Sequence, residues 1–304
     1  MRVLLTGAGG LIGRYCAKVL ATAGHEVIAI VRNSPVDKFW DYSSVSETWV
    51  VDLASENSVE QLCDLNSGLT FDSFVHCAAD MSAITSGDQD QHVLYRNNID
   101  SLWNILSFRQ ICSTPTFLYF STFFVSYLEQ SQQMQSVMSP YTLSKMHGES
   151  LCRMFVENDD FRLMVVRPSF VYGFVPQQDD LISKWLQFAL VDDELHIAGD
   201  GETIRNYVYV EDVASAVLKM LETSAIGTKL MINPEDISLN YVIEAIADVM
   251  SPKLVRHEYI DMHVSGFPTD GLRGARFDHC FMTIQQGITH MKRIYETHLR
   301  DIQS

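Results

Sequence analysis

The stretch Val3-Leu4-Leu5-Thr6-Gly7-Ala8-Gly9-Gly10-Leu11-Ile12-Gly13 decides the fold. Its three leading apolar residues predict a short strand, and residues 12–23 have the spacing of an amphipathic helix. Between them, Gly7, Gly10 and Gly13 allow a tight turn, a close approach of backbone to a pyrophosphate, and close packing of helix on strand. The helix N-terminus adds free N–H groups and a positive dipole end. We therefore expect a dinucleotide site at Gly7, Gly10, Leu11, Ile12 and Gly13.

Outward from this turn, short apolar runs alternate with longer amphipathic stretches. Further strands are expected at 27–31, 48–51, 74–77, 117–121 and 163–167, and long helices at 90–112 and 139–155. This alternation predicts parallel βαβ units with right-handed crossovers, and continuous apolar strands imply a sheet covered on both faces. The fold class is therefore α/β, with a Rossmann-type doubly wound parallel sheet.

The regular alternation of short apolar runs and amphipathic stretches changes after Arg167-Pro168. We expect a dinucleotide-binding domain made of 1–170 and 206–232. A smaller, interleaved C-terminal lobe made of 171–205 and 233–304 is expected to bind the substrate.

Composition excludes some function classes. The formal net charge of −16 disfavours nucleic-acid binding, because an acidic chain repels phosphate backbones. The scattered cysteines indicate reduced thiols and a cytoplasmic location. We expect no membrane span, since no apolar run reaches about 18 residues, and no metal site.

The ends of the second and third strands bear on cofactor choice. An acidic residue after the second strand favours NAD, but Arg32 and Asn33 stand there. Arg32 pairs with a 2′-phosphate, stacks on adenine, or is a solvated surface residue. The first alternative favours NADP over NAD. Asp52, followed by Leu53, is expected to accept a hydrogen bond from the adenine amino group.

Tyr141 and Lys145 stand four residues apart and share one face of the predicted helix. A nearby ammonium favours the phenolate, so we expect Lys145 to lower the pKa of Tyr141. The phenol then exchanges a proton with a substrate oxygen. Thr122, just past a strand end, offers a hydroxyl to the same oxygen.

Several motifs occur in order along the chain. They are Thr6 to Gly13, His76-Cys77-Ala78-Ala79, Asn98, Phe120-Ser121-Thr122-x-x-Val125, Pro140-Tyr141-x-x-x-Lys145, Arg167-Pro168-x-x-Val171-Tyr172-Gly173, and Gly199-Asp200-Gly201-x-x-x-Arg205-Asn206-Tyr207. With these motifs the chain resembles, over residues 1 to 250, the extended short-chain dehydrogenase/reductase family, in its NAD-dependent epimerase/dehydratase group.

The resemblance implies a role for each matched residue. Tyr141 is implied as general acid/base, Lys145 as the group that holds the nicotinamide ribose, and Thr122 as the group that polarises the substrate oxygen. The implied cofactor contacts also include Cys77, Ala78, Ala79, Asn98, Pro168 and Val171. The implied substrate contacts are Met81, Thr122, Phe170 and Arg205, of which Arg205 meets a diphosphate. Asn98 as a bridge between backbone groups, and Arg205 as a surface ion pair, stay open.

The chain also departs from the family pattern. Phe123-Phe124 replaces the Asp-Glu pair of the sugar dehydratases, which argues against 4,6-dehydration. Phe170 replaces a common asparagine, and Gly271 to Arg276 stands where the family has its closing segment.

These features predict an NAD(P)-dependent enzyme that acts on a nucleotide-linked sugar by reducing a 4-keto group. The alternatives are a nucleotide-sugar 4-epimerase that retains NAD, and a non-catalytic protein that senses NADP. By resemblance, the helices at 90–112 and 139–155 predict a homodimer.

Overall fold

The computed structural model describes residues 1–33, 45–81, 89–130, 138–159, 161–175, 180–191, 194–223, 225–257 and 266–303. The chain forms two compact units. The first unit comprises Met1–Pro168, Ala214–Met231 and Arg273–Phe277. The second comprises Ser169–Val213, Ile232–Leu272 and Asp278–Ser304.

The first unit is built on a parallel sheet. Its strands are β1 (Arg2–Thr6), β2 (Glu26–Val31), β3 (Glu47–Val50), β4 (Ser73–His76), β5 (Thr116–Phe120), β6 (Arg162–Pro168) and β11 (Gly227–Met231). Their order across the sheet is β11-β6-β5-β4-β1-β2-β3, and every neighbouring pair is parallel. The predicted α/β, doubly wound fold class is confirmed.

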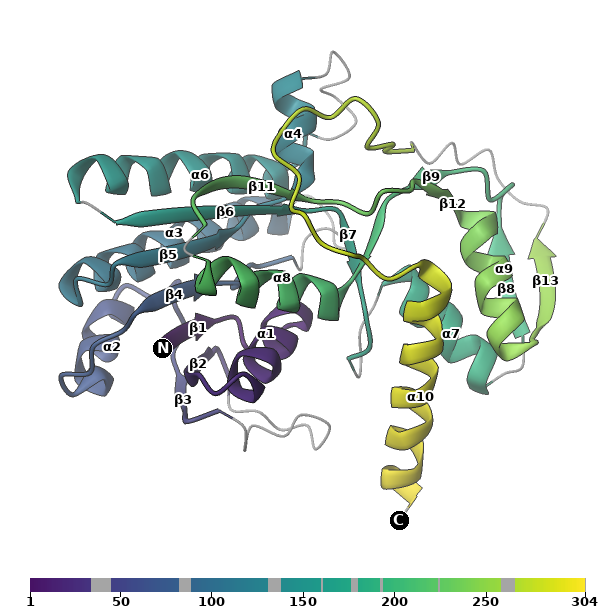
Figure 1. The fold of residues 1–304 in the computed structure, drawn as a ribbon, viewed down its shortest axis with the longest axis horizontal. Helices are drawn as coiled ribbons and strands as arrows, with labels where there is room; N and C mark the ends of the chain where they lie inside the picture. The colour runs from purple at the N-terminus through teal and green to yellow at the C-terminus, as the bar shows by residue number, and fades with distance from the viewer. Residues whose placement is uncertain are drawn as a thin grey trace. The chain divides into compact units, whose positions relative to one another are not determined.

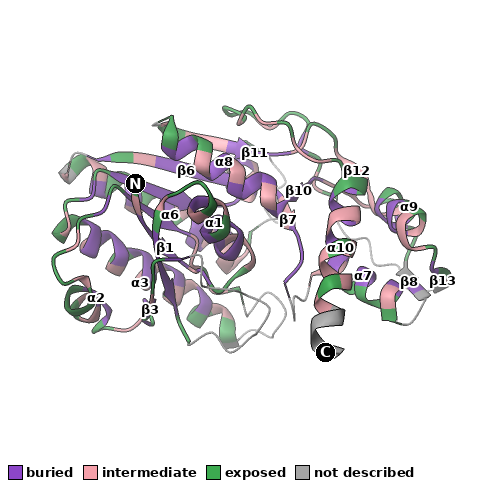
Figure 2. Ribbon diagram, turned by 60° about the horizontal axis from the view of Figure 1, so that its bottom comes forward, coloured by how far each residue is buried: buried purple, intermediate pink, exposed green. Residues whose placement is uncertain are grey.

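Helices cover both faces of this sheet (Figure 1). They are α1 (Leu11–Thr22), α2 (Ser58–Asn66), α3 (Gln89–Ile111), α4 (Phe123–Gln130), α6 (Pro140–Asn158) and α8 (Val210–Glu222), whose first turn belongs to the second unit. Helices α3 and α6 lie side by side on one face, whereas α1 and α8 lie on the other. Figure 2 shows that the strands between these layers are mostly buried. The core includes the stacked rings of Phe74 and Phe108, and β5 is buried over its whole length.

The strand order contains a switch point between β1 and β4. From β1 the chain proceeds outward to β2 and β3, whereas from β4 it proceeds to β5, β6 and β11 on the other side. Ligands of open parallel sheets bind beyond the carboxyl ends of the strands at such a point. The glycine turn after β1 and the segment after β4 both lie there.

In the parts of the second unit that the structure describes there are three short strand pairs and three helices. β7 (Phe170–Tyr172) pairs in parallel with β10 (Tyr207–Tyr209), β9 (Ile204–Arg205) is antiparallel to β12 (Ile237–Ser238), and β8 (Glu194–Ala198) is parallel to β13 (Lys253–His257). The helices are α7 (Leu181–Val191), α9 (Leu239–Met250) and α10 (Ile284–Gln303). The spacing of apolar residues over 177–190 also predicts a helix; α7 covers 181–190 of that range, and 177–179 lie outside the described residues. No helix in the described ranges has the length and apolar character that a membrane span requires.

Candidate active site

The turn after β1 is sterically restricted to glycine at two of its positions. A Cβ at Gly7, where φ is +70°, would lie 2.5 Å from the backbone nitrogen of Ala78. A Cβ at Gly13 would overlap the carbonyl oxygen of Gly7. At Gly10 it would meet nothing nearer than 3.5 Å, so space is open over the middle of the turn. The turn is therefore packed tightly against the protein on one side and open on the other.

The first turn of α1 has donors available for an anion. Gly10 is its N-cap, with no side chain to accept from the first backbone N–H groups. Leu11 and Ile12, in that first turn, are only partly buried. These orphan N–H groups and the open space fit the phosphates of a dinucleotide. The predicted phosphate turn thus has the geometry that such a cofactor needs.

Arg14 is a residue that the sequence reasoning missed. Its side chain is 8% exposed, and its Nε donates to the carbonyl oxygen of Gly9 at 2.8 Å. The contact braces the glycine turn and places a fixed positive charge beside it. A cation directly after the last glycine, in an otherwise apolar helix start, was the available signal.

A buried pair joins β1 to β4. Thr6 Oγ1 lies 2.9 Å from His76 Nδ1 and accepts from the Ala78 N–H at 3.2 Å. His76 is 1% exposed, and burial, with a smaller effect of the Lys145 charge, lowers its pKa to about 3. Burial also raises the pKa of the Cys77 thiol. The segment after β4 is therefore held by neutral groups.

The residues expected to read the adenosine half lie at the ends of β2 and β3. Arg32 and Asn33 are exposed, and Arg32 makes no ion pair within the described residues. Asp52 is also exposed and accepts from the Ala54 N–H at 3.1 Å. Leu53 is buried, and its carbonyl accepts from Asn104 at 2.9 Å. Within the described residues, the Arg32 guanidinium and one Asp52 carboxylate oxygen thus have no hydrogen-bond partner at these two strand ends.

The start of α6 places Tyr141 and Lys145. Ser139 caps the helix by accepting from the Thr142 N–H at 3.1 Å, and Pro140 begins it. Lys145 lies one turn further on and is 3% exposed. Its ammonium donates to the Phe120 carbonyl at 2.8 Å and lies 5.8 Å from the centroid of the Tyr141 ring. Within the described residues this is its one hydrogen bond, so two of its three N–H donors are left for a ligand.

The expected lowering of the Tyr141 pKa is wrong for the protein without ligands. Burial raises the pKa of Tyr141 to about 12 and lowers that of Lys145 to about 8. The reason is that both groups lose water, which disfavours the phenolate and the ammonium alike. Tyr141 is therefore a neutral phenol at neutral pH.

Thr122 follows β5 and begins α4. It is 6% exposed, and its hydroxyl accepts from the Phe124 N–H at 3.4 Å, the long contact of a helix cap. The hydroxyl proton is left to donate. Phe123 and Phe124 follow, with ring centroids 4.5 Å apart. The position beside Thr122 is therefore aromatic and carries no acid.

Asn98 on α3 ties the segment after β4 to α6. Its side chain accepts from the Asp80 N–H at 2.6 Å and donates to the Asp80 carbonyl and to Ser144 Oγ. Both amide N–H groups are thus used inside the protein. Ala79 and Met81, on either side of Asp80, are exposed. Asn98 therefore bridges the Asp80 backbone and the Ser144 side chain, and Ser144 directly precedes Lys145.

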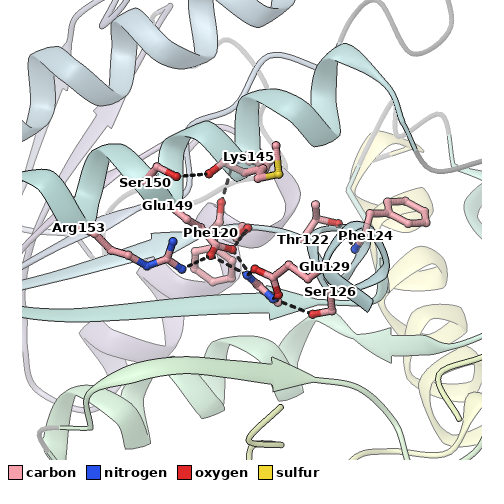
Figure 3. A network of polar contacts seen from close by, with 12 residues as sticks. Phe120, Thr122, Phe124, Ser126, Glu129, Lys145, Glu149, Ser150 and Arg153 are labelled. Carbon is pink, nitrogen blue, oxygen red and sulfur yellow. Dashed lines mark hydrogen bonds and ion pairs between the residues drawn. The ribbon is translucent and has the colours of Figure 1, made fainter. Parts of the chain in front are cut away.

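A buried ionic network lies beside these groups, and sequence reasoning did not identify it (Figure 3). Arg167 at the end of β6 is paired with Glu149 on α6 and with Glu129 on α4. Ser121, directly before Thr122, donates to Glu149 at 2.6 Å. The signals were a charged residue inside an apolar strand and a glutamate four residues after Lys145.

Pro168, a predicted cofactor contact, ends β6 in the first unit and is buried. The remaining predicted residues belong to the second unit. Val171 lies on β7, opposite Val208 of β10. The Arg205 guanidinium stands 4.9 Å from the centroid of the Phe170 ring. Phe170 in turn contacts Tyr207 and Phe267, with centroids 5.9 and 6.3 Å away. The structure thus brings the two predicted substrate contacts of this unit together.

Comparison with known proteins gives the family of the chain and relatives of its sequence and fold. The model of the NAD dependent epimerase/dehydratase family matches residues 3–233. A dTDP-4-dehydro-6-deoxy-D-allose reductase of Streptomyces sp is 27% identical over 98% of this chain and 97% of its own. A protein of Bacillus subtilis named as an uncharacterized UDP-glucose epimerase is 27% identical over 84% of each chain. The solved Thermus thermophilus UDP-glucose 4-epimerase, in complex with NAD, is 22% identical, with a TM-score of 0.76 over 97% of this chain and 99% of that one.

Proposed function

The chain belongs to the NAD-dependent epimerase/dehydratase family of enzymes, and from that premise we propose that it reduces the 4-keto group of a nucleotide-linked sugar with NADPH. In this proposal Tyr141 donates the proton and Thr122 polarises the carbonyl. The substrate class is also that of the Streptomyces relative, whose name describes a reductase of a dTDP-linked 4-keto sugar.

The placement of Tyr141 and Lys145 on one helix, with the Lys145 ammonium 5.8 Å from the centroid of the Tyr141 ring, carries the proposal. Reduction of a ketone to an alcohol needs one hydride and one proton. Burial raises the pKa of Tyr141 to about 12, so the phenol holds its proton at neutral pH and can donate it to an oxygen that gains negative charge. An oxidation would have to begin with a phenolate, which burial disfavours here. The initial state of Tyr141 therefore fits reduction better than the first step of an epimerisation.

The chain's own groups have clear parts in this reaction. The bound cofactor supplies the hydride. Gly7 to Gly13 hold its phosphates, and the two unused N–H donors of Lys145 bind its ribose hydroxyls. Tyr141 donates its phenolic proton to the carbonyl oxygen as that oxygen gains charge, and the Thr122 hydroxyl donates a hydrogen bond to the same oxygen. A proton from water then restores Tyr141.

Two features limit the alternatives. Elimination of water needs a further acid and base, but Phe123 and Phe124 stand after Thr122 and supply neither. Arg32 is exposed and without an ion pair among the described residues, which suits the 2′-phosphate of NADP. NADP rather than NAD is therefore part of the proposal. The epimerase alternative is favoured by the name of the Bacillus relative.

The remaining expectations complete the proposal. Arg205, beside Phe170, binds the substrate's diphosphate through its planar guanidinium. Helices α3 and α6, which expose Trp103 and Met154, pair with those of a second copy in a homodimer. The free cysteines are consistent with a cytoplasmic location.

Absorbance at the wavelength of reduced cofactor tests the reaction directly. The purified protein is mixed with NADPH and a dTDP-linked 4-keto-6-deoxy sugar. We expect one NADPH to be consumed for each sugar reduced. Interconversion of two sugar epimers with no net change of cofactor would replace the proposal by the epimerase. Absence of any turnover, with NADPH bound, would reject both.

A further inference from the structure

Arg167 makes an unusually complete set of contacts for a buried cation. It is 5% exposed. Its Nε and one terminal nitrogen donate to the two oxygens of Glu149 at 2.7 and 2.8 Å. Its terminal nitrogens also donate to both oxygens of Glu129 at 2.7 Å, and one of them to Ser126 Oγ at 2.9 Å. All five N–H donors of the guanidinium are therefore used, in a fixed planar geometry.

Glu149 also has two hydrogen bonds to each of its carboxylate oxygens. It is 1% exposed. One oxygen accepts from Arg167 and from Ser121 Oγ at 2.6 Å, and the other accepts from Arg167 and from Arg153 at 2.8 Å. Two positive and two negative side chains meet, so the network carries no net charge. Glu149 lies one helical turn after Lys145, on the same face of α6.

The network has a definite place in the fold. Figure 3 shows Glu149 of α6 and the pair Ser126 and Glu129 of α4 converging on one point, with Thr122 at the start of α4 nearby. The chain around Thr122 is held on both sides. Before it, the Ser121 N–H donates to the Val166 carbonyl at 2.8 Å and the Ser121 hydroxyl bonds Glu149. After it, Ser126 and Glu129 bond Arg167.

We propose that Arg167, through Glu129 and Glu149, is a positioning residue that fixes the Thr122 hydroxyl relative to Tyr141 and Lys145. This inference rests on the proposed function, in which Thr122 polarises the carbonyl. The reasoning is geometric. Helix α4 is a short helix of eight residues that Thr122 itself caps with a long hydrogen bond. Arg167 anchors it at Ser126 and Glu129, in addition to the two hydrogen bonds between Gln130 and the Arg273 backbone at its last residue. Through Glu149, Arg167 also ties α4 to α6, the helix that carries Tyr141 and Lys145.

Glu129 is the residue that makes this testable. Its side chain is 46% exposed, so water can reach the Arg167 donors that its substitution releases, and Arg167 keeps its pair with Glu149. Glu129→Gln keeps shape but loses the charge-assisted pair, and Glu129→Ala removes the anchor. Glu129→Asp keeps the charge but withdraws it by one methylene. Glu157→Gln is the matched control, since Glu157 is an exposed glutamate of α6 outside the network.

The first measurement needs no substrate. Hydrogen–deuterium exchange should accelerate within 123–130 in Glu129→Ala, and less in Glu129→Gln, while α3 and the sheet strands keep wild-type protection. Glu157→Gln should match the wild type throughout. Unchanged exchange of α4 in Glu129→Ala would overturn the proposal, whatever the activity of the protein.

The second measurement separates positioning from mere stabilisation. Well below the melting temperature, kcat for NADPH oxidation with the 4-keto sugar should fall about tenfold in Glu129→Ala, because small displacements of catalytic groups are costly. Glu129→Asp should lie between it and the wild type. The dissociation constant of NADPH should stay unchanged. A wild-type kcat in a variant whose α4 has loosened would refute the proposal. A wild-type protein without turnover would instead refute the proposed function, and the exchange result alone would then judge the anchoring.

Discussion

The buried histidine between β1 and β4 makes a quantitative prediction about acid stability. His76 is 1% exposed, stacks on Tyr119 with ring centroids 6.0 Å apart, and has Nδ1 2.9 Å from Thr6 Oγ1. Burial, together with the nearby Lys145 charge, lowers its pKa to about 3, whereas the ordinary value is 6.5. The folded protein therefore keeps this ring neutral at a pH where the unfolded chain protonates it.

The sign and size of the effect follow from proton linkage. The unfolded chain binds one more proton than the folded chain between pH 3 and 6.5, so stability is complete above 6.5 and falls as the pH falls through this window. Each pH unit within it is worth about 1.4 kcal/mol, and the full window about 5 kcal/mol. From about pH 7.5 to about pH 4.5 this single group should remove about 3 kcal/mol from the free energy of unfolding. That is a large share of the 5–15 kcal/mol by which proteins are typically stable.

The assay is urea unfolding over this pH range. The quantity compared between variants is the change of the free energy of unfolding with pH. His76→Asn keeps a side chain able to bond Thr6 but cannot titrate, so its stability should fall by about 3 kcal/mol less than that of the wild type. His92→Asn, at an exposed histidine, is the control and should follow the wild type. Parallel curves for the wild type and His76→Asn would refute the reasoning, whatever their difference at neutral pH.

Three further predictions concern the site and the assembly. Tyr141→Phe should lower kcat at least about a hundredfold and leave NADPH affinity unchanged, since general acids contribute 10²–10⁴-fold and the phosphates rest elsewhere; fluorescence titration checks the affinity, and a near wild-type rate would remove Tyr141 from its role. Arg32→Asp should reverse a preference for NADP into one for NAD in paired titrations; tighter NAD binding by the wild type would contradict it. Trp103→Glu, at a half-exposed ring of α3, should convert a dimer into a monomer by light scattering, and a monomeric wild type would reject the dimer.

The fold was predictable because its signals are local. The glycine turn and the apolar strands before and after it carry their own periodicity, so the sheet and its long helices were expected close to their observed bounds. Strand β11 was not expected, because Gly227-Thr228-Lys229 has no apolar run. It is defined by pairing with β6 instead. Helix α4 was also missed, since Phe123-Phe124-Val125 contains weak helix formers. In the structure, the Thr122 cap and the contacts with Arg167 hold it.

The elements that carry the candidate site residues were predictable, but the electrostatics of those residues were not. The spacing of Tyr141 and Lys145 placed them together on α6, as observed. The direction of the Tyr141 pKa was wrong, because burial cannot be read from a four-residue spacing. Arg167 was noted only as part of a motif. Its partners come from α4 and α6. No local sequence pattern predicts that β6, α4 and α6 meet at the Arg167 guanidinium.

The difference between a reductase and an epimerase on this fold comes down to which proton is present at the start. Both chemistries need a hydride at the same carbon and a proton at the same oxygen. A reductase begins with a protonated tyrosine and an exchangeable reduced cofactor, whereas an epimerase begins by removing a substrate proton. In this chain, burial keeps the Tyr141 phenol protonated and brings the Lys145 pKa to about 8. Lys145 is thus partly neutral just above neutral pH, where it favours the phenolate less than a fully charged lysine would. Both shifts disfavour the oxidative start, and both agree with a site in which Phe123 and Phe124 supply no second acid or base.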